Sequence, residues 1–159
     1  MKHLMRKLLL MTTSTFLLCS CASSSSITSS SSTIKSSQSS VVDEDDNMTL
    51  KIDDKEIDVT WLDNDSVKAL KKILPLTINM HEYGGFEQTG SIGQSITRND
   101  KQIDVLPGDI VLYNGNQISV FYSTSSWSYT RLGHINNKTN EELNTLLNKE
   151  SVTFVLKVL

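Results

Sequence analysis

Two cysteines, the only thiols among the 159 residues, are the most reactive side chains in the sequence. Cys19 and Cys21 are two residues apart, at the end of an apolar run and the start of a serine run. A disulfide between them would close a very tight, strained ring. A metal site needs more ligands, and no His, Asp or Glu occurs in the twenty residues after Cys21. Neither a disulfide nor a metal centre is therefore favoured.

The residues before these cysteines have the layout of a secretory signal peptide. Residues 1–7 carry three cations and no acid, and residues 8–18 are uncharged and mostly apolar. This stretch is short for a membrane-spanning helix, which needs about 20 apolar residues. The segment Leu18-Cys19-Ser20-Cys21 resembles a bacterial lipobox. The resemblance implies cleavage before Cys21 and a lipid on its thiol, whereas an ordinary cleaved signal peptide and a retained anchor remain as alternatives.

Composition divides the chain into three parts. Residues 1–20 are the predicted lipoprotein signal peptide. Residues 21–47 are rich in serine and end in an acidic cluster, so they bury too little apolar surface to fold, and we expect a disordered tether. Residues 48–159 carry regularly spaced apolar side chains and are long enough for one core. We expect this domain to be held at the bacterial cell envelope, on the outer face of the cytoplasmic membrane or on an outer membrane if there is one.

The charge of the chain argues against nucleic acid as a partner. Its formal net charge is −3, from 15 basic and 18 acidic side chains. Loss of residues 1–20 would remove Lys2, Arg6 and Lys7 and leave 12 basic against 18 acidic side chains, or −6. An acidic domain lacks the basic surface that neutralises phosphates, and it is repelled by anionic lipid headgroups. Membrane contact is therefore expected through the N-terminal lipid alone.

The usual catalytic and cofactor motifs are not found in the domain. His81 and His134 have no histidine partner at helical spacing, so we predict no metal. No nucleophile elbow and no phosphate-binding glycine loop occurs, and we predict no cofactor. Glu82 and Glu87 flank a predicted turn, and we interpret both as solvated carboxylates.

The elements that must position any site are mostly strands. Period-two alternation or β-rich composition predicts eight of them, at residues 50–52, 57–61, 76–83, 86–92, 110–113, 118–122, 129–135 and 152–159. Helical spacing predicts helices at residues 67–74 and 143–147, the second preceded by a capping box at Thr139-Asn140-Glu141-Glu142. Residues 95–102 and 123–128 are predicted loops, and Asp104–Asp109 a turn. Hairpin connections favour a small, closed or nearly closed β-barrel in which the first and last strands are neighbours.

Particular segments add a family resemblance. They are Asp63-Asn64-Asp65-Ser66-Val67-Lys68-Ala69-Leu70, Leu74-Pro75-Leu76-Thr77, Pro107-Gly108-Asp109-Ile110-Val111-Leu112-Tyr113, Val120-Phe121-Tyr122 and Tyr129-Thr130-Arg131-Leu132-Gly133-His134-Ile135. In this order and spacing they resemble the bacterial cyclophilin-like domain family over residues 48–159. The resemblance implies a mainly β fold, a small closed cyclophilin-like barrel of about eight strands with two short helices.

The same resemblance raises prolyl isomerisation as a candidate activity. Cyclophilins that catalyse it carry a Phe-His-Arg segment and a Gln-Gly-Gly-Asp stretch, and neither occurs here. Beyond residue 20 the only arginines are Arg98, in a predicted loop, and Arg131, which we interpret as an exposed or ion-paired strand residue. We therefore favour a non-catalytic binding module for an unknown peptide or small molecule, and keep a divergent isomerase acting on exported proteins as the alternative.

An aromatic cluster supports the binding hypothesis. Trp127 lies among serines, and exposed tryptophan and tyrosine side chains are common binding anchors. The alternative is that Trp127 folds back as a lid over the end of the barrel. The predicted groove residues are Trp127, Tyr129, Arg131, Tyr83 and Phe86.

Overall fold

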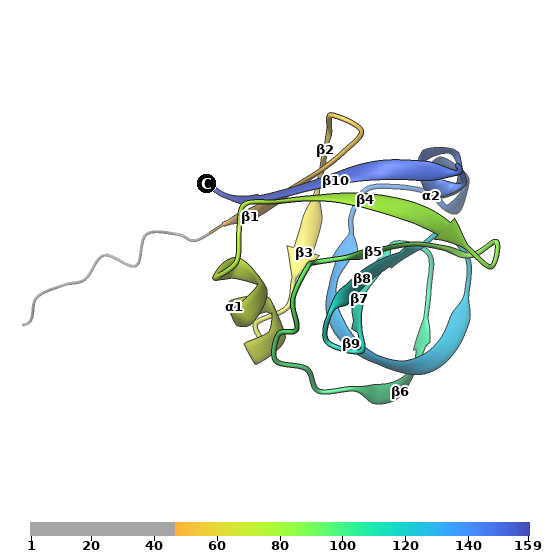
Figure 1. The fold of residues 1–159 in the computed structure, drawn as a ribbon. Coiled ribbons are helices and arrows are strands. Elements are labelled where there is room, and N and C mark those ends of the chain that lie inside the picture. The colour runs from red at the N-terminus through yellow and green to blue at the C-terminus, as the bar shows by residue number, and fades with distance from the viewer. Residues whose placement is uncertain (1–46) are drawn as a thin grey trace, which may run out of the picture. The chain divides into compact units, whose positions relative to one another are not determined.

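The computed structural model describes residues 47–159, which form a nearly closed antiparallel barrel with two helices (Figure 1). The strands are β1 (Met48–Ile52), β2 (Lys55–Ile57), β3 (Val59–Trp61), β4 (Leu76–Tyr83), β5 (Glu87–Ser91), β6 (Lys101–Val105), β7 (Asp109–Tyr113), β8 (Gln117–Phe121), β9 (Ser125–Ile135) and β10 (Ser151–Val158), and the helices are α1 (Asp65–Lys71) and α2 (Asn140–Leu147). The predicted mainly β, barrel-type fold is confirmed. The predicted signal peptide, the lipidation site Cys21 and tether residues 21–46 lie outside the described residues.

The sheet order explains how the barrel nearly closes. Neighbouring strands follow the order β2-β1-β10-β4-β5-β8-β7-β9-β3, and β6 pairs with β9 beside this path. The two ends of the path, β2 and β3, are consecutive in sequence and separated only by Asp58. The Trp61 indole N–H also donates to the Met48 carbonyl at 2.8 Å, which ties β3 to β1. The prediction that the first and last strands are neighbours is confirmed, since β1 pairs with β10 and Met48 lies opposite Val158.

Local sequence signals set several of these elements. The Asn114-Gly115 pair adopts positive φ angles of 50° and 77° between β7 and β8, as a tight hairpin with two left-handed central residues requires. The Asn64 side chain caps α1 by accepting from the Val67 N–H, and the predicted capping box of α2 is formed by Thr139 and Glu142. Each cap satisfies donors that the first helical turn leaves unpaired.

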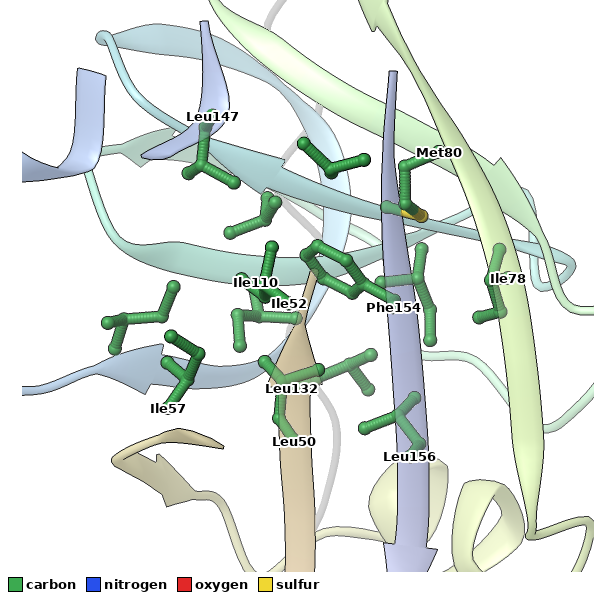
Figure 2. Packing of buried hydrophobic residues seen from close by; sticks show 14 of the residues in the cluster. Leu50, Ile52, Ile57, Ile78, Met80, Ile110, Leu132, Leu147, Phe154 and Leu156 are labelled. Carbon is green, nitrogen blue, oxygen red and sulfur yellow. The ribbon is translucent and has the colours of Figure 1, made fainter. Parts of the chain in front are cut away.

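The main core lies inside the barrel and is built from alternate residues of its strands. Figure 2 shows Phe154 of β10 among side chains from β1, β4, β7 and β9. Val67 and Leu70 of α1 and Leu143, Leu146 and Leu147 of α2 complete this core. Burial of each large apolar side chain contributes roughly 1.5–3 kcal/mol, and these contacts hold the barrel together.

Two predicted loop boundaries were wrong. Residues 101–105, assigned to a loop and a turn, form β6, and Ser125–Ser128, assigned to a loop, begin the long strand β9. The two segments pair with each other, with Ile103 opposite Trp127. Ser125–Ser128 has no apolar alternation, and in residues 101–105 the alternation is limited to Ile103 and Val105, so the pairing of the two backbones makes these segments strands. This pairing also places Trp127 in a strand instead of a loop.

Candidate functional site

A second, smaller hydrophobic cluster lies on the other face of β7 and β8. Successive side chains of a strand point to opposite faces. Ile110 and Leu112 of β7 therefore enter the main core, whereas Val111 enters the second cluster. Phe121 of β8 joins Val111 there. The sheet thus has apolar side chains on both faces, and the second face needs its own cover.

The cover is an arm formed by β6 and the first half of β9. The second half of β9 pairs with β7, and the register shifts at Ile110/Val111. Such irregularities bend and twist a strand, and Figure 1 shows β9 curving strongly toward β6. The arm places Val105, Ile103 and Tyr129 against the second cluster.

Aromatic rings line the gap between this arm and the sheet. Phe86 stacks on Phe121, with ring centroids 6.2 Å apart and planes 6° apart. Tyr129 meets Phe121 and Tyr113 edge-on, at centroid distances of 5.6 and 5.9 Å. Tyr83 meets Phe86 edge-on at 6.1 Å. These are favourable geometries for aromatic pairs, so the rings form a preorganised surface.

A glycine turn lets Phe86 take this position. Gly84 and Gly85 have φ angles of 67° and 77°, in the left-handed region. A Cβ atom on Gly84 would lie 2.2 Å from the Phe86 ring, closer than any real contact allows. The Gly85 N–H donates to the Glu82 carboxylate, which holds the turn closed. The β4–β5 turn is therefore shaped around the Phe86 ring.

The gap is an open pocket with a volume of about 430 Å³. Its lining residues are Tyr83, Phe86, Glu87, Thr89, Tyr113, Gln117, Ser125, Ser126, Trp127 and Tyr129. Trp127 is 58% exposed and Tyr83 is 62% exposed, so both rings face solvent at its rim. Trp127 is therefore not a buried lid. The size and the aromatic lining are typical of a small-ligand site.

Four of the five predicted groove residues line this pocket, and Arg131 does not. The pocket brings together Tyr83, Phe86, Trp127 and Tyr129. The Arg131 guanidinium instead donates to the Asp109 carboxylate at 2.6 Å and to the Asp104 carbonyl at 2.9 Å. The side chain of Asp109 is only 3% exposed, and His134 Nδ1 lies 2.9 Å from its other oxygen. In this arrangement Arg131 compensates a buried carboxylate at the start of β7.

The other arginine of the described residues is also paired. Arg98 forms an ion pair with Asp100 at 3.1 Å and contacts the Asn114 side-chain oxygen at 3.4 Å. Neither Arg98 nor Arg131 is among the pocket-lining residues. The pocket within residues 47–159 thus lacks a guanidinium beside its aromatic surface.

Among the six lining residues outside the predicted groove, Glu87 is the one that carries a carboxylate. It was taken as a solvated carboxylate, and this is wrong, because its residue is only 6% exposed. Its Oε2 atom is buried and has no hydrogen-bond partner among residues 47–159. Burial raises the pKa of Glu87, and the neighbouring Ser119 hydroxyl opposes that shift. The strand Glu87–Ser91 contains no apolar residue, so alternation gave no signal of which face is buried.

The Glu87 carboxylate also affects the tyrosines around it. Burial raises the pKa of Tyr129, and the negative charge of Glu87 raises it further. The pKa of Tyr122 is raised by burial and by the carboxylates of Glu82 and Glu87. The charge of Glu87 therefore disfavours ionisation of both phenols.

Residues 47–159 contain neither a cluster of metal ligands nor a membrane-spanning helix. No three His, Cys, Asp or Glu side chains lie together in a way that would hold a metal ion. Neither helix is long and apolar enough to cross a membrane.

Comparisons with known proteins show which family and which solved structure this fold is similar to. A model of a family described as cyclophilin-like matches residues 50–157. No match was found among curated proteins. Among solved structures, the chain is similar to the solution structure of a hypothetical protein from Archaeoglobus fulgidus, with a TM-score of 0.54 and 16% identity, over 70% of this chain and 93% of that chain. At this identity the structural likeness concerns the fold alone.

Proposed function

The chain belongs to the cyclophilin-like family, and from that premise we propose that residues 48–159 are a ligand-binding module displayed at the bacterial cell surface by a lipid on Cys21. The aromatic pocket carries this proposal. Its two rim aromatics are more than half exposed although apolar surface is available beneath them. Exposed aromatic side chains around a concave surface are typical of binding sites.

A ligand screen on the full-length protein in a non-ionic detergent tests the binding role. Ligand-observed NMR with a library of neutral and charged small molecules and short peptides is expected to give hits that weaken when Trp127 and Tyr83 are both changed to alanine. The matched control is Leu106→Ala, because Leu106 is a similarly exposed apolar side chain outside this pocket. Hits that survive the double substitution, or no hits at all, would overturn the assignment of this pocket.

Anchoring through Cys21 has its own matched control in Cys19. We expect Cys21→Ser to abolish incorporation of an alkyne-tagged palmitate and to release the protein from the membrane fraction. Cys19→Ser should retain both properties, since the predicted cleavage removes that residue. Equal labelling of the two variants would contradict the lipobox interpretation.

A divergent prolyl isomerase is the second candidate, favoured by the family membership and by an apolar pocket able to take a proline ring. Catalysis would require a group that weakens amide resonance against a barrier of about 18–20 kcal/mol. Both described arginines are paired elsewhere. We therefore expect a proline peptide to isomerise at the uncatalysed rate. Catalysis that disappears in Arg98→Ala or Arg131→Ala would make the protein a foldase.

A further inference from the structure

We propose that the aromatic pocket takes a protonated primary amine carried on an apolar body, with the ammonium group at Glu87 and the body against the surrounding rings. This inference rests on the proposed function, because it assumes that the pocket is the ligand site. It goes beyond that function by naming the charge and chemistry of the ligand.

The first support is the unsatisfied oxygen of Glu87. A buried polar atom without a partner is uncommon in folded proteins and costs free energy. Glu87 Oε2 is such an atom, and it belongs to a residue that lines the pocket. Oε2 itself is buried, so a ligand N–H reaches it only when the Glu87 side chain turns toward the pocket, and it then supplies the partner that residues 47–159 do not. A quaternary ammonium has no N–H to donate, whereas a protonated primary amine has three, the most of any alkylammonium, so this oxygen favours a primary amine.

The second support is the lack of a compensating cation. Among residues 47–159 the ion pairs involve other carboxylates, and no lysine or arginine lines the pocket. The titratable groups in the lining besides Glu87 are the phenols of Tyr83, Tyr113 and Tyr129. A phenol carries no positive charge, so none of these groups opposes the field of the carboxylate. A buried carboxylate attracts a cation and repels an anion in such a site.

The third support is the number of rings around the carboxylate. A cation over the face of tryptophan, tyrosine or phenylalanine gains about 0.5–2 kcal/mol from the ring quadrupole. The five aromatic residues of the lining are Trp127 and Tyr129 from β9, Tyr83 and Phe86 from the β4–β5 hairpin, and Tyr113 from β7. The same rings bury an apolar body, so one site serves both parts of the ligand.

The test compares charged ligands with neutral counterparts on the full-length protein in non-ionic detergent. The first pair is 2-phenylethylamine and 2-phenylethanol, which differ at the polar terminus. The second pair is Nα-acetyl-lysinamide and its Nε-acetylated form, which asks whether a lysine side chain is the source of the amine. Binding is followed by calorimetry and by tryptophan emission excited at 295 nm. A Trp127→Phe variant assigns the emission, because the domain holds a second tryptophan, Trp61.

At least one amine is expected to bind about 10- to 100-fold more tightly than its neutral partner, the range that a charge-assisted hydrogen bond provides. Glu87→Gln should remove this preference. The matched Glu150→Gln variant should keep it, since Glu150 is an exposed carboxylate outside the pocket. Retention of the preference by Glu87→Gln would overturn the role of Glu87.

The wild-type comparison separates failure of this inference from failure of the proposed function. Equal binding of amine and neutral partner, lost with Trp127→Ala, overturns the amine and leaves the binding pocket in place. If none of the four probes binds at millimolar concentration, the amine inference is overturned. If the ligand screen also gives no hits, the assignment of this pocket as a binding site is overturned as well. A preference seen only in the lysine pair identifies a peptide side chain as the source, and one seen only in the phenyl pair identifies a free amine.

Discussion

Glu87 is predicted to lower the stability of the domain at neutral pH. The perturbation is Glu87→Gln, which keeps the shape of the side chain and removes its charge. Leaving a buried acceptor unpaired costs about 1–3 kcal/mol, and more for a charged group. Solvent in the open pocket screens part of this cost. We therefore expect Glu87→Gln to increase the free energy of unfolding by about 1–2 kcal/mol at pH 7.

The pH dependence gives the sign of the effect. Burial raises the pKa of Glu87 above its ordinary value of 4.5, so the folded state binds this proton more tightly than the unfolded state. Between the two pKa values the unfolded chain therefore holds fewer protons, and stability falls as pH rises through this window. The advantage of Glu87→Gln should be complete above the folded-state pKa and should disappear below about pH 4.

Other carboxylates change stability in the same pH range, so the difference between the two proteins is the useful quantity. Hydrogen bonds from the Thr153 and Thr139 backbones lower the pKa values of Asp53 and Glu142. Their contributions are lost as pH falls, equally in wild type and variant. Glu150→Gln, at an exposed position, controls for a general charge effect and should change stability by less than about 0.5 kcal/mol.

The assay is urea unfolding of the full-length protein, followed by circular dichroism between pH 4 and pH 8. Burial and nearby carboxylates raise the pKa values of Tyr122 and Tyr129, so their phenols do not ionise in this range. A Glu87→Gln variant less stable than wild type at pH 7, or a stability difference independent of pH, would refute the reasoning. A stabilised variant that loses amine binding would show that the carboxylate is kept for the ligand at a cost in stability.

Two further stability predictions use matched pairs of variants and the same unfolding assay. Arg131→Ala should lower the free energy of unfolding by about 1–3 kcal/mol, because it leaves the buried Asp109 carboxylate with fewer donors. Arg98→Ala removes a more exposed ion pair and should lower it by less than about 1 kcal/mol. Equal losses in the two variants would contradict the structural role of Arg131. Gln88→Leu should cost about 2–3 kcal/mol, because its fully buried amide donates to two carbonyls at the C-terminal end of α2, at 2.8 and 2.6 Å. Gln102→Leu, at an exposed β6 position, should be close to neutral, and a similar loss there would indicate that the α2 contacts are unimportant.

Many elements of the fold were predictable because their signals are local. The hairpin at Asn114-Gly115 follows from two residues that accept positive φ, and the α2 boundary follows from a capping box four residues long. The apolar strands were found because alternate side chains share one face. The helix predicted from Val67 ends at Lys71 rather than at Leu74, because Pro75 already disturbs the preceding turn.

The aromatic members of the candidate site were predictable from residue type, but their assembly was not. Tyr83, Phe86, Trp127 and Tyr129 were predicted as one groove, and the structure places them around one pocket. Arg131 was included because it is two residues from Tyr129. The register between β7 and β9 shifts next to Arg131, and its guanidinium donates to the buried carboxylate of Asp109 instead of lining the pocket.

The sequence by itself determined the kind of fold and the aromatic composition of the site, because composition, alternation and turn chemistry act over a few neighbouring residues, whereas the three-part organisation of the chain stays a prediction. Only the tertiary structure decided that the serine-rich residues 125–128 are a strand and that Glu87 is buried. Both depend on partners distant in sequence. Ser125 pairs with Val105, twenty residues earlier, and Glu87 pairs with Phe121, thirty-four residues later. A polar strand shows which face it will bury only when those partners are in place.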